Sequence, residues 1–238
     1  MKRTLHYERM RPWELRRALE ESPVAYIPLG ALEFHGWHLP LGYDALKAHE
    51  ICLRAAAQTG GAVLPPAWHG YAGGLGDAFG SIPAEEEWVL GCLRRTCERL
   101  ADTGFRVLVV LTGHYPEEQV AGVKNTAREI TSARPGLVVM ALSEAEAYPT
   151  EFRGDHAAKW ETSIAMHLFP EMVELKRMER HDDPLCGVRG DDPRETASAR
   201  LGRETVDRIL EVLTAQVREA LRGGRPKPPW WYGNVSHE

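Results

Sequence analysis

The stretch FRVLVVLTG, residues 105–113, is a continuous apolar run that ends in a glycine. Runs of this kind are typical of central parallel strands, which are buried on both faces. The segments VAYIPLG (24–30) and GLVVMALS (136–143) have the same character, and GAVLPP (61–66) predicts a short further strand. These four segments predict the core of a sheet.

Helical patterns separate the predicted strands. The segments at 45–60 and 84–104 are rich in helix formers and end in glycine, and the second begins with three glutamates at its positive end. Further helices are predicted at 12–21, 116–133, 159–171 and 196–222. Strand–helix alternation at this spacing predicts an α/β fold, a three-layer α/β/α sandwich with a mostly parallel central sheet.

Length and composition are those of an ordinary globular domain. The chain has 238 residues, of which 43% are hydrophobic and 26% charged, so it is long enough for one well-buried core. We expect a single domain over 1–238, with 223–238 forming a Pro- and Trp-rich tail. Two readings of this tail stay open: it is disordered, or Trp230 and Trp231 pack onto a neighbouring subunit.

Charge and segment analysis exclude several kinds of partner. Asp and Glu number 34 against 29 Lys and Arg, a net charge of −5 without a basic block, so nucleic acid is not an expected partner. The longest apolar run, 107–111, is too short to cross a bilayer, and the N-terminus lacks the apolar core of a signal peptide. Four cysteines without CxxC pairing predict a cytoplasmic protein with reduced thiols.

Acids and histidines gather in loops that leave the predicted strands. Ligands of such sheets bind at the carboxyl ends of the strands, and the loops at those ends begin at residues 30, 65, 113 and 143. Three of these loops lead to chemically capable side chains: Glu33, His35 and Asp44; then His114; then Asp155, His156 and Glu161. This convergence at one edge predicts a functional site.

The residue types in the first loop suit a metal ion. Glu33 and His35 lie two positions apart, so in an extended segment they point to the same side. Carboxylates and imidazoles without thiolates suit Zn²⁺, Mn²⁺ or Fe²⁺, and the two oxygens of Asp44 allow it to bridge two ions. The alternative is that Asp44 caps the helix at 45 while backbone groups satisfy His35 and His38. Spacing alone leaves both interpretations open.

The other candidates also have plain explanations. His114 alone reads as a polar residue at a strand end, Asp155 and His156 as turn residues, and Glu161 as a solvated acid in a first helical turn. Their common position at one sheet edge favours metal chemistry over these separate explanations.

Three motifs resemble those of the creatininase family. The stretch PLGALEFHGWHLPLGYD (28–44) is similar to the first motif of that family, LTGHYPEEQ (111–119) to the second, and GDHAAKWETS (154–163) to the third. FGSI (79–82) resembles part of a further family loop. The resemblance runs from about residue 24 to 170, with the motifs in family order.

The resemblance implies a three-layer α/β fold, a metal centre of one or two divalent ions, and hydrolysis of a C–N bond in a small molecule such as a cyclic amide or formamide. It implies that Glu33, Asp44 and His114 hold one ion, while His35 and Asp44 hold the second, with Asp44 bridging. It also implies a homo-oligomer, often a hexamer.

One ligand implied by the resemblance is missing. Creatininase carries a further glutamate two residues after the histidine of the second motif, where this chain has Pro116. Glu117 is one residue further on, and Glu161 is our preferred replacement. Together with Gly76, which stands where many members have a histidine, these departures argue against creatinine as the default substrate.

The expected mechanism is attack of a metal-bridged hydroxide on a carbonyl carbon. His156 would carry a proton to the leaving nitrogen, Asp155 would orient its ring, and Glu161 would take part beside them. Tyr115 either contacts the substrate or oxyanion, or simply packs. Further expected roles are substrate contact for Trp160 and Lys159, and support of the loop or a ligand for His38.

Two competing functions remain. The same dinuclear site suits hydrolytic C–C cleavage of a cyclic ketone such as a ketoinositol, as in inositol catabolism. A catalytically silent scaffold is the alternative from another class, supported only by Pro116.

Overall fold

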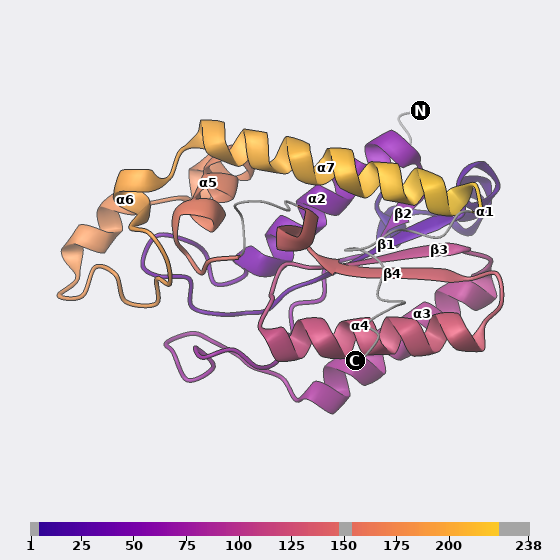
Figure 1. Ribbon diagram of the computed structural model, residues 1–238, viewed down its shortest axis with the longest axis horizontal. Helices are drawn as coiled ribbons and strands as arrows, with labels where there is room; N and C mark the ends of the chain where they lie inside the picture. The colour runs from indigo at the N-terminus through magenta and orange to yellow at the C-terminus, as the bar shows by residue number, and fades with distance from the viewer. Residues whose placement is uncertain (1–4, 148–153, 224–238) are drawn as a thin grey trace, which may run out of the picture.

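The computed structural model describes residues 5–147 and 154–223. Its centre is a four-stranded parallel sheet with the strand order β2-β1-β3-β4 (Figure 1). The strands span Val24–Leu29 (β1), Ala62–Val63 (β2), Val107–Thr112 (β3) and Val138–Ser143 (β4). The predicted parallel sheet is confirmed, with the apolar run at 105–113 supplying one of its two inner strands.

Helices cover both faces of the sheet, as the three-layer prediction requires. In Figure 1, α2 (Tyr43–Thr59) and α7 (Ala199–Leu221) lie on one face, and α3 (Glu86–Thr103) and α4 (Glu117–Ala133) lie on the other. The remaining elements are α1 (Pro12–Glu21), α5 (Lys159–Leu168), α6 (Pro193–Thr196) and 3₁₀ turns at Tyr7–Arg9, Glu144–Ala147, Pro170–Met172 and Leu175–Arg180.

Alternating side chains of the strands divide the core into two clusters. Tyr26 and Val109 pack in the cluster that includes residues of α2 and α7, whereas Leu108 and Val110 pack in the cluster that includes residues of α3 and α4. Because successive residues of a strand point to opposite faces, a fully apolar strand fills both clusters at once. This is why the central strands read as unbroken apolar runs.

Two glycines at strand ends allow α2 to approach the sheet closely. A Cβ atom on Gly30, just after β1, would lie 2.2 Å from the backbone nitrogen of Ala45, and one on Gly113, just after β3, would lie 2.2 Å from the carbonyl oxygen of Asp44. The helix begins at Tyr43 rather than at the predicted residue 45. Asp44 therefore lies within its first turn, at the carboxyl edge of the sheet.

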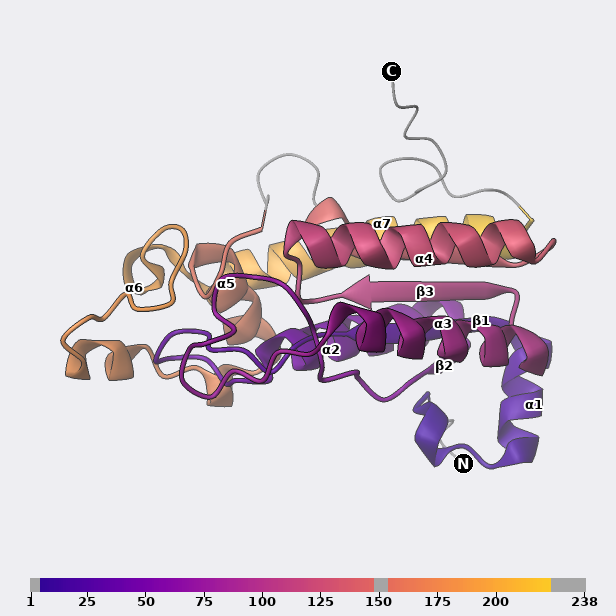
Figure 2. The same cartoon turned by 90° about the horizontal axis from the view of Figure 1, so that it is seen from below.

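The segment after α5 differs from its prediction. A continuous helix over 196–222 was expected, but α7 begins at Ala199 because the hydroxyl of Ser198 accepts a hydrogen bond from the N–H of Leu201 at 3.2 Å. A Cβ on Gly202 would lie 1.8 Å from the carbonyl oxygen of Ser163, so α7 contacts the backbone of α5 directly. Figure 2 shows β3 pointing toward the end of the molecule that α5 and α6 occupy.

Two further expectations concern membrane-spanning helices and the C-terminal tail. None of the described helices has the length and apolarity needed to span a bilayer. Trp230 and Trp231 of the predicted tail lie outside the described residues.

Candidate metal centre

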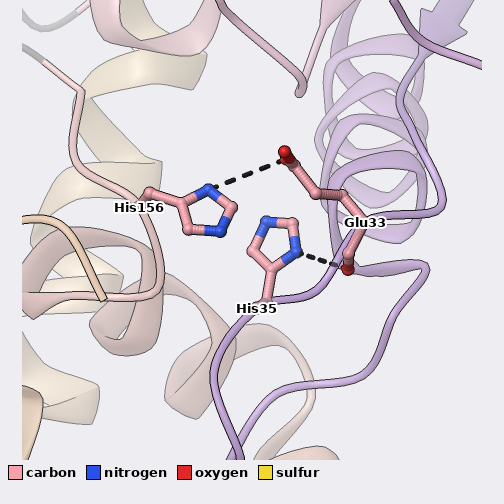
Figure 3. Close-up of side chains that lie close together, drawn as sticks. All are labelled: Glu33, His35 and His156. Carbon is pink, nitrogen blue, oxygen red and sulfur yellow. Dashed lines mark hydrogen bonds and ion pairs between the residues drawn. The ribbon is translucent and has the colours of Figure 1, made fainter. Parts of the chain in front are cut away.

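The loop after β1 presents Glu33 and His35, both of which are buried. His35 Nδ1 lies 3.0 Å from the backbone oxygen of Glu33 (Figure 3). A carbonyl oxygen only accepts hydrogen bonds, so Nδ1 carries the proton and Nε2 of the neutral ring is left with a lone pair. That Nε2 lies 2.9 Å from Asp44 Oδ1 and 3.6 Å from Glu161 Oε2. The ring is therefore fixed in the tautomer that a metal ligand needs.

His114, which follows β3, repeats this arrangement. Its Nε2 lies 3.2 Å from the carbonyl oxygen of Tyr71, on the glycine-rich loop, which fixes the proton on that nitrogen. Its Nδ1 lies 3.1 Å from Asp44 Oδ2 and 3.2 Å from Glu33 Oε2. A lone pair again faces two carboxylates. Two buried rings thus have one nitrogen held by a backbone carbonyl and the other directed at acids.

His156 has the same pattern in the third loop. Its Nε2 lies 2.8 Å from the carbonyl oxygen of Phe34, and its Nδ1 lies 3.8 Å from Glu33 Oε2 (Figure 3). The ring packs against that of His35, with centroids 4.2 Å apart. The sequence-based expectation that Asp155 orients this ring is wrong, because the backbone of Phe34 holds it.

Asp44 joins the two sides of the centre. Its Oδ1 faces His35 and its Oδ2 faces His114, as a bridging carboxylate requires. The capping interpretation of Asp44 is wrong: the N-cap residue of α2 is Gly42, and no side chain caps that helix. The early start of α2 explains the difference, since it places Asp44 inside the helix and between the two rings.

Glu161, in the first turn of α5, is the most tightly held acid of the centre. Its Oε1 accepts hydrogen bonds from Lys47 Nζ at 2.5 Å and from the hydroxyl of Tyr115 at 2.8 Å. Its Oε2 accepts one from the N–H of Ala157 at 2.8 Å. Lys47 lies one helical turn after Asp44 and also forms an ion pair with the buried Glu144. Of the two oxygens of Glu161, Oε1 is thus taken up by Lys47 and Tyr115, whereas Oε2 faces His35.

The electrostatics of the centre favour bound cations. Burial alone would lower the pKa of both rings, but Asp44 raises the pKa of His35 to about 9, and Asp44 with Glu33 raises that of His114 to about 10. Among the described residues, four carboxylates are buried and only one lysine is buried with them: Glu33, Asp44, Glu144 and Glu161, with Lys47. The raised pKa values place both rings in a strongly negative environment. A bound metal ion would supply the positive charge that balances these carboxylates.

The ligand atoms form overlapping groups of the size of metal sites. In each of three groups, the candidate atoms all lie within 4.8 Å of one another. We call Glu33, Asp44 and His114 site 1, and His35, Asp44 and Glu161 site 2; the third group is Glu33, His35 and His156. Oxygen and imidazole donors sharing one carboxylate fit a pair of Zn²⁺-, Mn²⁺- or Fe²⁺-type ions.

A cavity of about 110 Å³ opens onto both sites. Its lining combines acids and imidazoles with a rim of small residues: Glu33, Asp44, Gly73, Gly74, Leu75, Gly113, His114, Tyr115, Pro116, Asp155, His156, Glu161 and Arg189. The predicted edge of the sheet is therefore the place where the loops form a pocket.

Asp155 and Tyr115 line this cavity but are engaged with α5. The carboxylate of Asp155 accepts hydrogen bonds from the N–H groups of Trp160, at 2.7 Å, and Glu161, at 3.1 Å. Burial and then Glu161 raise the pKa of Asp155 to about 7. The hydroxyl of Tyr115 contacts Glu161 and the carbonyl oxygen of Asp155. Both residues fix the start of α5, which carries Glu161.

The structure does not bring every candidate to the cavity. Trp160 packs against the core cluster with α2 and α7, and Lys159 lies over its ring, with Nζ 5.1 Å from the centroid. Neither belongs to the cavity lining, so their assignment to substrate contact gains no support. Glu117 is exposed at the start of α4, whereas Glu161 is buried beside His35. The geometry favours Glu161 as the replacement ligand.

His38 stands apart from both sites. It is buried, and its Nε2 lies 2.9 Å from the hydroxyl of Thr162, the residue after Glu161. Burial lowers its pKa to about 4, so the ring is neutral. His38 supports the contact between the first loop and α5.

Three residues of the site, Lys47, Glu144 and Arg189, were not predicted from the sequence. Lys47 lies three residues after Asp44 on a helix, and Glu144 directly follows β4 at the edge where ligands bind. Closeness to a candidate ligand and a place at a strand end were the sequence signals that could have identified Lys47 and Glu144. Arg189 lies in a loop that carries no motif, and only the folded structure brings it to the cavity.

The fold and this centre define an α/β/α protein with a carboxylate- and imidazole-lined cavity at the carboxyl edge of a parallel sheet. A family profile described as "Creatininase: Creatinine amidohydrolase" matches residues 8–217. The chain therefore belongs to the creatininase family of hydrolases, as its motifs suggested.

Known proteins of two activities are similar to it. A creatinine amidohydrolase of Pseudomonas putida is 29% identical over 84% of this chain and 88% of its own length. A 3-dehydro-scyllo-inosose hydrolase of Thermotoga maritima is 26% identical over 71% of this chain and 58% of its own length. A crystal structure of creatininase superposes with a TM-score of 0.78 at 25% identity, covering 92% of this chain and 99% of that one. A creatininase described as of zinc–zinc type has a TM-score of 0.77 at 25% identity, covering 92% and 98%.

Proposed function

We propose that this protein is a metal-dependent hydrolase that cleaves a C–N bond of a small cyclic amide or formamide. The observation that carries the proposal is the convergence of five buried candidate ligands from four segments of the chain, Glu33, His35, Asp44, His114 and Glu161, with the ring lone pairs directed inward. A mutant of the related creatininase described as of zinc–zinc type and a manganese form of creatininase support divalent ions of this kind.

Each residue of the centre has a defined part. Glu33, Asp44 and His114 would hold one ion at site 1, and His35, Asp44 and Glu161 would hold the other at site 2. Bound divalent ions lower the pKa of water and polarise a carbonyl group. The chain itself fixes the positions of the ligands around a small cavity.

His156 is the proposed proton carrier. Because the carbonyl oxygen of Phe34 fixes the proton on Nε2, Nδ1 faces the centre and is free to accept a proton and pass it to the leaving nitrogen. Burial and the neighbouring His35 lower the pKa of His156, so its ring is neutral near pH 7 and able to accept. Asp155 and Tyr115 act on Glu161 and the start of α5.

Metal analysis and a substrate panel test the proposal. Protein purified without chelator should contain one to two equivalents of a divalent ion and should hydrolyse a member of a panel of lactams and formamides. Protein without metal that also fails to bind added Zn²⁺ or Mn²⁺ would exclude the mechanism. Metal-loaded protein without turnover on any panel member would support the silent scaffold.

A second candidate is hydrolytic C–C cleavage of a cyclic ketone. It is favoured by the similarity to the inosose hydrolase of Thermotoga maritima. The same ligands serve either reaction, so ketoinositols belong in the panel, and the product masses distinguish the two. Assembly as a homo-oligomer, possession of a small-molecule substrate and a cytoplasmic location remain predictions, the first testable by light scattering in solution.

A further inference from the structure

Arg189 lies at the mouth of the cavity and is the one arginine or lysine among the residues that line it. The lining also contains four carboxylates, those of Glu33, Asp44, Asp155 and Glu161. Residue 189 is exposed, and no ion pair joins its guanidinium to another residue in the described parts of the chain. A cation above an acidic centre that forms no ion pair with the described residues suggests a role toward a ligand.

The backbone of Arg189 is anchored to the proposed proton carrier. Its N–H donates to the carbonyl oxygen of His156 at 2.8 Å, and its carbonyl oxygen accepts from the N–H of His156 at 3.0 Å, forming an antiparallel bridge. The Cα atom of Arg189 is therefore held in register with His156. The position of this side chain is coupled to the site.

The glycine-rich loop leaves room for the guanidinium. A Cβ atom on Gly74 would lie 2.3 Å from Nη2 of Arg189, so the guanidinium lies directly against the backbone of this loop. Gly73 and Gly74 are both exposed and line the cavity. Arg189 thus reaches from the third loop to the glycine-rich loop at the rim.

The cavity itself is small. Its volume of about 110 Å³ lies well below the roughly 300–1,000 Å³ of typical small-molecule sites. A substrate larger than its reacting amide must therefore extend outward past Gly73, Gly74 and Arg189. If ions balance the ligand carboxylates, as the proposed function requires, the guanidinium remains as a positive charge on this exit path.

We propose that Arg189 binds an anionic group of the substrate, a carboxylate or a phosphate, located next to the bond that is hydrolysed. The planar fork of guanidinium donors matches the paired oxygens of either anion. This inference rests on the proposed function for the position of the reacting bond. It narrows the substrate class to small amides that carry an anionic substituent.

Three probes with one formamide group separate the possibilities: N-formylglycine, N-formylaminomethylphosphonate and the uncharged N-formylglycinamide. Affinity is measured by titration calorimetry on the zinc-loaded protein, or as KM where a probe is hydrolysed. We expect one or both charged probes to bind about tenfold more tightly than the amide. The charged probe with the higher affinity identifies the anion.

Variants assign the preference to Arg189. Arg189→Gln should abolish the difference between charged and uncharged probes, and Arg189→Lys should retain part of it. The affinity for N-formylglycinamide should be the same in all three proteins. Arg95→Gln, an exposed arginine on α3, makes the same change of net charge away from the cavity and should leave the preference intact.

Two results would overturn the inference: a preference for the anions that survives in Arg189→Gln, which would indicate binding to the metal ions alone, or charged probes that bind no better than the amide or do not bind. Different results would contradict the proposed function and this inference. A protein that binds anionic probes through Arg189 but hydrolyses no amide would contradict only the function, and one that hydrolyses neutral amides without any role for Arg189 would contradict only this inference.

Discussion

The two candidate metal sites share Asp44 but differ in how their second acid is held. At site 1, the ion pairs that Glu33 forms within the described part of the chain are with imidazole rings, His114 at 3.2 Å and His156 at 3.8 Å. At site 2, Glu161 already accepts hydrogen bonds from a buried ammonium, a phenol and a backbone N–H. A carboxylate whose charge is partly neutralised attracts a cation less, although it is better oriented. We therefore expect site 1 to bind its ion more tightly than site 2.

Loss of the shared ligand should have the largest effect. Asp44→Asn removes the charge on which both sites depend, so both ions should be lost. Activity should fall at least about 10³-fold, since bound metal contributes several kcal/mol to stabilising the transition state. Metal content by mass spectrometry and kcat/KM on the substrate that the panel identifies check this. The matched control is Asp207→Asn on the exposed side of α7. Retention of two equivalents by Asp44→Asn would refute the bridging role.

Substitution of one histidine per site should separate the two affinities. A calorimetric titration of chelator-treated protein with Zn²⁺ should show a tighter and a weaker phase. His114→Ala should remove the tighter phase and His35→Ala the weaker one, because each ring serves a single site. Both variants should lose most activity. If either variant removed both phases equally, the two groups would act as one site and the comparison would fail.

The two sites also differ in how far their residues could be predicted from the sequence. Glu33, His35, Asp44 and His114 were predictable because they follow strand ends that must meet at one edge of a parallel sheet. Lys47 was not, since a lysine in a helix usually lies in water. Only the packing of α2 between the sheet and α5 buries it and places it against Glu144 and Glu161.

Other departures have equally local causes. The start of α2 and the position of Asp44 depend on the close approach at Gly30 and Gly113, which no helix signal encodes. The group that orients His156 is the backbone carbonyl of Phe34. Because every residue has such a carbonyl, this contact leaves no signal in the sequence. Side-chain motifs thus predicted the candidate ligands, whereas their orientation depends on main-chain contacts that form only in the folded loops.

Removal of Lys47 should act on stability and on site 2 in opposite directions. Lys47→Met leaves two buried carboxylates without their cation, which should cost about 3–5 kcal/mol of folding free energy in the metal-free protein. The same uncompensated charge should strengthen Zn²⁺ binding at site 2, so added metal should recover much of the lost Tm. Urea unfolding with and without Zn²⁺ measures both effects. The double variant Lys47→Met/Glu144→Gln removes one of the two charges and should be more stable than the single one. A weaker site 2 in Lys47→Met would mean that orientation of Glu161 matters more than its charge.

The smallest effects should come from residues around Glu161 that are not ligands. Tyr115→Phe removes one of three hydrogen bonds to that carboxylate, so we expect a decrease in kcat of about tenfold or less, with metal content unchanged. Lys159→Ala, in the same motif but outside the cavity lining, should leave kcat and KM within about twofold of the parent, as surface substitutions usually do. A steady-state comparison of the two variants at equal zinc loading decides the matter. A KM effect of Lys159→Ala larger than the kcat effect of Tyr115→Phe would restore the lysine as a substrate contact and show that the cavity extends along α5 when substrate is bound.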